Sequence, residues 1–395
     1  MSKAKALSRV PRGIRKVKVR HLIYGALITL LLFMSAESLV ALSPYKPHAA
    51  TQYFRAKVTS VQAIESGQMQ AIHAQLQDGP NKGQVVFTTR SISFGDTGYK
   101  RLPVGSIILL SKEQSNGNLY SFISRWYMPG LATLCIILLA LVVLIGAWRG
   151  ITSIFGLCIS ILILTVFVVP QVMKGKPAFA TCIVAAVIIT FVSLYIAHGV
   201  SKRTTVALAG SLIALLMVVG LTAFAVYVSG TSEVIDEGNV GILYASQPID
   251  VSGLLTGGIV IASLGTLFDI TTGQAAAVDE IYTANRSQST RQVFYKGMSV
   301  GREHIAALIN TLALVYAGVA LPAIITTAIV AQSYRQVPLL VNLNTETIAE
   351  EVVRTIVASI ALLLALPLTT LLAAYILPRW NHDADLRFKR WLKSL

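Results

Sequence analysis

Residues 129–148 of this chain read PGLATLCIILLALVVLIGAW, and residues 151–170 read ITSIFGLCISILILTVFVVP. Neither stretch contains a charged side chain, and each is 20 residues long. An α-helix rises 1.5 Å per residue, so about 20 apolar residues cross the ~30 Å hydrocarbon core of a bilayer. The two stretches therefore predict two membrane-spanning helices joined by a short connection at Arg149.

The same length criterion finds six further apolar runs outside this pair. They cover residues 23–43, 178–198, 205–228, 253–272, 305–331 and 355–377. The charged side chains inside the eight runs are Glu37 and Asp269. The first run follows a basic segment but is too long for the apolar core of a secretory signal, which favours a retained anchor helix. We predict an α-helical polytopic membrane protein with eight transmembrane helices.

The overall composition supports this class. Hydrophobic residues make up 54% of the chain, charged residues only 13%, and the mean hydropathy is +0.67. Soluble globular proteins carry about 25% charged residues, so a soluble protein is excluded. The three cysteines lie inside apolar runs without metal-ligand spacing, so we expect no disulfide, no bound metal and no cofactor.

Lysine and arginine set the expected orientation. If the amino terminus is cytoplasmic, 20 of the 33 basic residues fall on that side and 13 on the other. Nine of those 13 lie in the long segment 44–128, which counts little toward topology. We therefore expect both termini in the cytoplasm, with a basic tail at 1–22, a seven-helix core at 129–378 and a second tail at 379–395. The formal net charge of +15 is a topology signal, and no nucleic-acid partner is expected.

Residues 44–128 have a different pattern from the rest of the chain. Polar and apolar residues alternate between turn clusters at 79–81 and 116–118, which is typical of half-buried strands. We predict strands at 52–64, 69–77, 84–89, 106–112 and 119–124. Five short strands in this length favour a small extracytoplasmic all-β domain between the first two helices, with an oligonucleotide/oligosaccharide-binding (OB)-like barrel fold.

The sixth and seventh of the eight apolar runs, 253–272 and 305–331, contain or border polar residues. Ionisable groups in hydrocarbon cost several kcal/mol and are candidates for function. On a continued helix, Asp269, Thr272 and Glu280 share one face. Glycines at 253, 257, 258 and 265 precede them and allow a close approach of another helix or a substrate.

The seventh run carries a second polar stripe. Glu303 and Asn310 share a helix face, and Arg302 lies at the start of the run. Two interpretations remain open at this point. The two stripes either line a path for a cation or proton, or they form an interhelical hydrogen-bond lock.

Several motifs of these helices resemble the YibE/F-like family of bacterial multi-pass membrane proteins. They are Gly265-Thr-Leu-Phe-Asp269, Asp279-Glu280-Ile281, Ser299-Val-Gly-Arg-Glu-His304, Asn310-Thr-Leu-Ala-Leu-Val-Tyr-Ala-Gly318 and Leu321-Pro322. The resemblance covers roughly residues 44–378. It implies a bacterial plasma-membrane protein, and Glu303 stands where the family pattern has Asp. The positions that match the pattern are Asp269, Glu280, Gly301, Arg302, Asn310, Thr311, Tyr316, Gly318 and Pro322.

Our leading functional hypothesis is a permease or channel subunit for an ion or small solute, moving along a polar path between the sixth and seventh helices. The residues of this path, or of the alternative lock, are Asp269, Thr272, Glu280, Arg302, Glu303, Asn310 and Thr311. The alternative function is a non-transporting envelope assembly or sensing protein whose outer β domain binds a ligand or partner. No nucleotide-binding loop or protease motif is complete, so we do not expect an enzyme. The expected partners are the lipid bilayer, the solute or ion, and a second membrane subunit or further copies of the chain.

Overall fold

The computed structural model describes residues 51–64, 69–91, 102–113, 119–231, 250–333, 338, 341 and 344–380. The predicted basic tail at 1–22, the predicted anchor at 23–43 and nearly all of the predicted tail at 379–395 lie outside these residues. The chain divides into two compact units, one that ends at Ile145 and one that begins at Gly146. We call them the β unit and the helical unit and describe each by itself.

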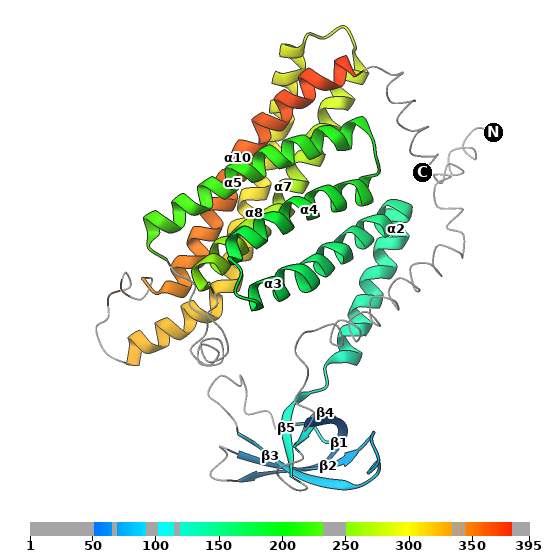
Figure 1. The fold of residues 1–395 in the computed structure, drawn as a ribbon, viewed down its shortest axis with the longest axis vertical. Helices are drawn as coiled ribbons and strands as arrows, with labels where there is room; N and C mark the ends of the chain where they lie inside the picture. The colour runs from blue at the N-terminus through cyan, green and yellow to red at the C-terminus, as the bar shows by residue number, and fades with distance from the viewer. Residues whose placement is uncertain are drawn as a thin grey trace, which may run out of the picture. The chain divides into compact units, whose positions relative to one another are not determined.

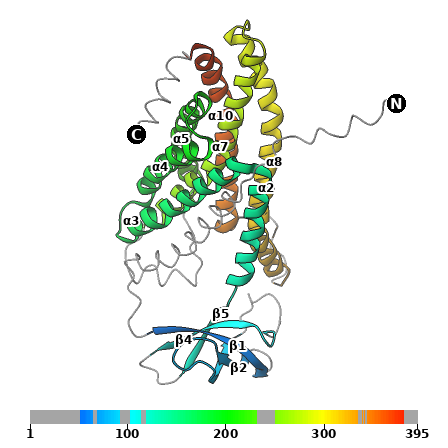
Figure 2. The same cartoon turned by 90° about the vertical axis from the view of Figure 1, so that its right-hand side faces the viewer.

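The β unit contains five antiparallel strands in the order β3-β2-β1-β4-β5. All five predicted strands are confirmed, with ends that differ by at most two residues. The strands are β1 (Thr51–Ile64), β2 (Met69–Leu76), β3 (Val85–Ser91), β4 (Ile107–Glu113) and β5 (Tyr120–Arg125). Figure 2 shows how the sheet of these strands curls.

Alternation along the strands builds the core of the β unit. Phe54, Ala56 and Val58 of β1 are buried, while the residues between them face outward. Successive side chains of a strand point to opposite faces, so the period-two pattern collects the apolar residues on the inner face. The ring of Phe54 packs edge to face against Tyr120 of β5, with centroids 5.8 Å apart. The hydrophobic alternation therefore determines which face is buried.

The sheet is a half-barrel in the residues that the structure describes. β3 and β5 are its two edge strands, and none of the four described ladders joins them. The edges nevertheless approach each other, because the guanidinium carbon of Arg90 on β3 lies 5.4 Å from the ring centroid of Phe122 on β5. The predicted OB-like barrel is not confirmed and stays a prediction.

Helix α2 (Met128–Ile163) contains the whole apolar stretch 129–148 and the first part of the stretch 151–170. Its backbone breaks at Ala147, with φ +48° and ψ −132°, close to the predicted connection at Arg149. A π-helical turn, η4 (Leu164–Val168), and the short helix α3 (Val169–Met173) continue the second stretch. Pro170 follows η4 and has no backbone N–H to donate, which fits the irregular hydrogen bonding at this point.

The remaining helices of the helical unit coincide with the other described apolar runs, although several are longer. They are α4 (Ala178–His198), α5 (Lys202–Ser229), α7 (Val251–Ala284), α8 (Thr290–Ser333) and α10 (Glu346–Arg379). In the described residues, six helices are long and apolar enough to cross a membrane when α2 and α3 are taken as one segment. The predicted total of eight is not confirmed.

Helix α7 is the centre of the helical unit. It contacts α4, α5, α8 and α10, which surround it in Figure 1. In the most apolar stretch of α7, 56% of the residues are buried, whereas in the corresponding stretch of α8 only 11% are buried. Small residues bring the helices together: a Cβ on Gly257 would lie 2.6 Å from the Cys182 sulfur of α4, and one on Gly210 of α5 would lie 2.6 Å from Thr369 Oγ1 of α10. The glycines therefore allow contacts that any larger residue would block.

Candidate polar path on helices α7 and α8

Helix α7 carries the first predicted polar stripe without interruption. Asp269 and Glu280 are exposed and Thr272 is half-buried, whereas Ile270 and Gln274 between them are buried. The helix runs on to Ala284, well past the apolar run, so the predicted shared face is confirmed. A Cβ on Gly258 or on Gly265 would meet no atom within 4 Å outside the neighbouring backbone of α7 itself. This face of α7 is therefore uncovered on the N-terminal side of Asp269.

Asp269 lies in an electrostatic environment made by two histidines. His304 of α8 packs against α7 one turn from Asp269, since a Cβ on Gly273 would lie 3.5 Å from His304 Cε1, an ordinary van der Waals distance. His304 and, more weakly, His198 at the end of α4 contribute to the electrostatic field at the Asp269 carboxylate, which is also partly desolvated. No salt bridge to Asp269 occurs among the described residues. The Asp269 side chain therefore lies on the surface of the helical unit, without a salt bridge and close to the α8 segment that carries His304.

The second predicted stripe lies on the outer face of α8. Arg302, Glu303, Asn310 and Thr311 are all exposed. The opposite face supplies Ile305 and Leu312, which are buried in the core of the helical unit. The Thr311 hydroxyl donates to the carbonyl of Ala307 in its own helix, 2.9 Å away.

No hydrogen bond or salt bridge in the described residues joins a candidate residue of α7 to one of α8. Among the described residues, the only ion pair of the set joins Glu280 Oε1 to Arg203 Nη2 at 2.7 Å, and Arg203 belongs to α5. The described contacts of the candidate residues therefore include one ion pair, from α7 to α5, and none between α7 and α8, and the choice between a path and a lock stays a prediction. Both stripes lie on exposed parts of the helical unit.

A hydrogen-bonded lock does exist, but it uses residues that the sequence analysis did not select. The Gln274 side chain of α7 is 2% exposed, and its Nε2 donates to the Gly297 carbonyl of α8 and to Thr370 Oγ1 of α10, both at 2.8 Å. A Cβ on Gly301 would lie 2.9 Å from Gln274 Oε1 and would collide with Leu366. Three helices thus meet at one buried amide.

A second group missed by the sequence analysis links α5 to α7. Asp279 is 1% exposed, and its carboxylate binds Lys202 Nζ at 2.6 Å and also Arg203 Nε. The sequence analysis counted both cations only as topology signals. The signal that was available is the pair Asp279-Glu280 one turn from a helix end, with Lys202-Arg203 at the start of another helix.

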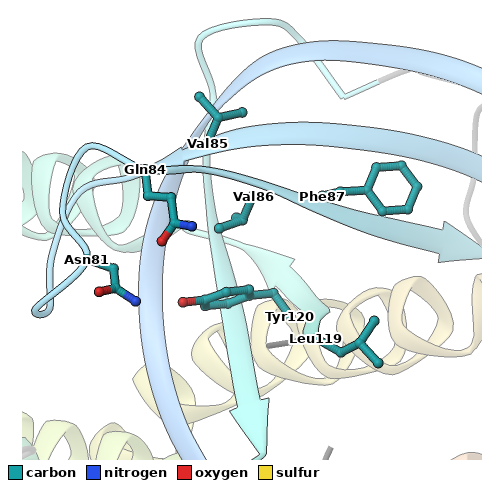
Figure 3. Close-up of a pocket in the computed structure, with 7 residues that line it drawn as sticks. All are labelled: Asn81, Gln84, Val85, Val86, Phe87, Leu119 and Tyr120. Carbon is teal, nitrogen blue, oxygen red and sulfur yellow. The ribbon is translucent and has the colours of Figure 1, made fainter. Parts of the chain in front are cut away.

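The β unit contains a pocket of about 260 Å³ between its two edge strands. Figure 3 shows the side chains around it, which come from the β2–β3 turn, from the start of β3 and from the start of β5. The lining includes the amides of Asn81 and Gln84 and the ring of Tyr120. The pocket exists where the β3–β5 ladder is missing.

In the described residues, six helices that are apolar and long enough to span a membrane and a five-stranded antiparallel sheet define the chain as a helical membrane protein with a β half-barrel. Within this class, the model of the YibE/F-like protein family matches residues 134–379, more than half of the chain, and the chain belongs to this family. The predicted resemblance is confirmed, although the match begins inside α2 and not near residue 44, so the strands lie outside it. No curated protein and no solved structure matches the chain.

Proposed function

We propose that the chain is a permease or channel subunit of the bacterial plasma membrane that moves an ion or small solute past α7 and α8. In this proposal it crosses the bilayer eight times. The spans are residues 23–43, the two parts of α2 on either side of Ala147, and α4, α5, α7, α8 and α10. Both termini lie in the cytoplasm.

The observation that carries the proposal is the state of Asp269. A carboxylate at membrane depth is costly unless it is paired or reaches water. Asp269 is exposed, has no salt bridge among the described residues and lies one turn from Gly273, which His304 of α8 contacts. The open backbone at Gly265, one turn away, leaves room for a cargo next to the carboxylate. An accessible acid near an imidazole suits a cation or a proton better than an anion.

The test measures flux through the purified full-length chain in liposomes. Protons are followed with an entrapped pH-sensitive dye, and sodium and potassium with entrapped ion-sensitive dyes. We expect Asp269→Asn and Asn310→Ala each to reduce the flux at least tenfold, about 1.4 kcal/mol, while the amount of inserted protein stays the same. Thr326→Ala is the control, because Thr326 is exposed on α8 and its hydroxyl bonds only within its own helix, to Pro322.

Two results would remove the proposal: unaltered flux in both variants, or no flux of any tested ion through the unmodified chain.

The second candidate function is a non-transporting envelope assembly or sensing protein. The pocket of the β unit favours it, because that unit then supplies the binding site. Absent flux together with ligand binding by the β unit would select this second function.

A further inference from the structure

The pocket of the β unit has three polar groups directed into one space. In Figure 3 the amides of Asn81 and Gln84 and the hydroxyl of Tyr120 approach this space from different sides. None of these three side-chain groups has a hydrogen-bond partner in the part of the chain that the structure describes. Amides and hydroxyls both donate and accept, so together they offer a ligand several complementary bonds.

The positions of these groups are fixed by the fold. The Gln84 N–H donates to the Asn81 carbonyl at 3.1 Å, and the Gln84 carbonyl accepts from Leu76 N–H at 3.0 Å, so the backbone that carries both amides is fixed. The Tyr120 residue is only 7% exposed, and its ring packs on Phe54. The Tyr120 hydroxyl is therefore preorganised, which lowers its entropic cost of binding.

The remaining wall of the pocket is apolar and uncharged. Val86 is buried beside the Tyr120 ring, whereas Phe87 and Leu119 are 51% and 64% exposed at the rim. Among the described residues no charged side chain lines the pocket, and the Lys112 ammonium lies 5.4 Å from the Tyr120 ring centroid without being part of the lining. A charged ligand would lose hydration there without direct contact to a counter-charge of the lining, which is unfavourable. The pocket therefore suits an uncharged ligand with one apolar face and several hydroxyl or amide groups.

From this chemistry we propose that the pocket binds a neutral saccharide, with the hydroxyls of one sugar ring on the three polar groups and the next part of the glycan along Leu119 and Phe87, which lie on the other side of the Tyr120 ring in Figure 3. The volume of about 260 Å³ is close to the lower limit of small-molecule pockets, about 300 Å³, so it accommodates one ring of a longer glycan. The inference deepens the second candidate function, and it does not depend on transport by the helical unit.

The test measures binding of the full-length chain, in detergent micelles, to an array of neutral hexose and N-acetylhexosamine oligosaccharides. We expect binding to at least one glycan class, reduced roughly tenfold by Tyr120→Phe and by Gln84→Ala, because each removes one hydrogen-bonding group. Tyr120→Phe keeps the ring and its packing, so it separates the hydroxyl from the fold. Gln62→Ala is the control: Gln62 is an exposed amide of β1 that does not line the pocket.

Three outcomes would overturn the inference. One is no binding to any neutral glycan on the array. Another is binding that both pocket variants leave unchanged. The last is binding of unstructured peptides, in place of sugars, that depends on Tyr120 and Gln84. Because flux is not measured here, failure of this test leaves the transport proposal intact, and failure of the flux test leaves this one intact.

Discussion

The carboxylate oxygen Oδ1 of Asp279 on α7 lies 2.6 Å from the ammonium nitrogen of Lys202 on α5, although the Asp279 side chain is only 2% exposed. Its other oxygen binds Arg203. Both cations occupy the first turn of α5, where the helix dipole disfavours positive charge. The buried acid offsets that effect and fixes the start of α5 against α7.

The difference in exposure between the carboxylate and the two cations predicts which substitution destabilises the protein most. The cations are 36% and 41% exposed and can turn to water, whereas the carboxylate cannot. Replacing Lys202 and Arg203 together by Met leaves a buried charge without a partner and should cost about 3 kcal/mol, whereas Asp279→Asn alone should cost about 1 kcal/mol. Thermal unfolding in detergent micelles measures both.

The same cluster offers a rescue experiment. Adding Asp279→Asn to the double Met variant removes the unpaired charge, so most of the lost stability should return. The control replaces Lys174 and Lys176 by Met, because both are exposed in the turn between α3 and α4. A triple variant no more stable than the double one would show that packing, and not charge, dominates this contact.

Glycines on two faces of the bundle should respond oppositely to the addition of one methyl group. Gly301→Ala places a Cβ against Leu366 and the Gln274 amide and should destabilise the helical unit by about 1–3 kcal/mol. Gly265→Ala meets no atom within 4 Å and should be neutral or stabilising by up to about 1 kcal/mol, because alanine favours the helix. Unfolding in mixed micelles measures the stability of the two variants. Equal losses of stability would contradict the packing of α8 on α10.

Two glycines of the β2–β3 turn allow the cost of a steric collision to be measured apart from the cost of an unfavourable backbone conformation. Gly79 and Gly83 both have positive φ, +81° and +92°, but a Cβ would strike the Phe54 ring only at Gly79. We expect Gly83→Ala to cost about 1 kcal/mol from conformation alone, and Gly79→Ala to cost about 2–4 kcal/mol. Hydrogen exchange of the β1 amides in the full-length chain reports the difference. Similar protection in the two variants would contradict the contact of Gly79 with Phe54.

Much of the architecture could be predicted from the sequence because it depends on local patterns. Alternating residues such as Phe54, Ala56 and Val58 determine the strand faces without reference to distant parts of the chain. Uncharged stretches such as 178–198 determine helices by length alone, and α4 has those bounds in the structure. The polar face of α7 was also predictable, because a continuous helix places Asp269 and Glu280 on one side.

The candidate site was only partly predictable. Hydropathy distinguishes Asp269 from Asp279, since one lies inside an apolar run and the other beyond it. Hydropathy does not show which of them the other helices cover: in the structure Asp269 is exposed, and Asp279 is buried against α5.

The sequence by itself determined the class of the protein, the strands and the faces of its helices, because hydrophobic period and run length act over neighbouring residues. Only the tertiary structure decided which polar residues are buried and which are open. That choice depends on which helix packs against which, so Lys202 must lie beside Asp279, and Gly297 and Thr370 beside Gln274, from positions 77, 23 and 96 residues away in the chain. No local pattern encodes those pairings.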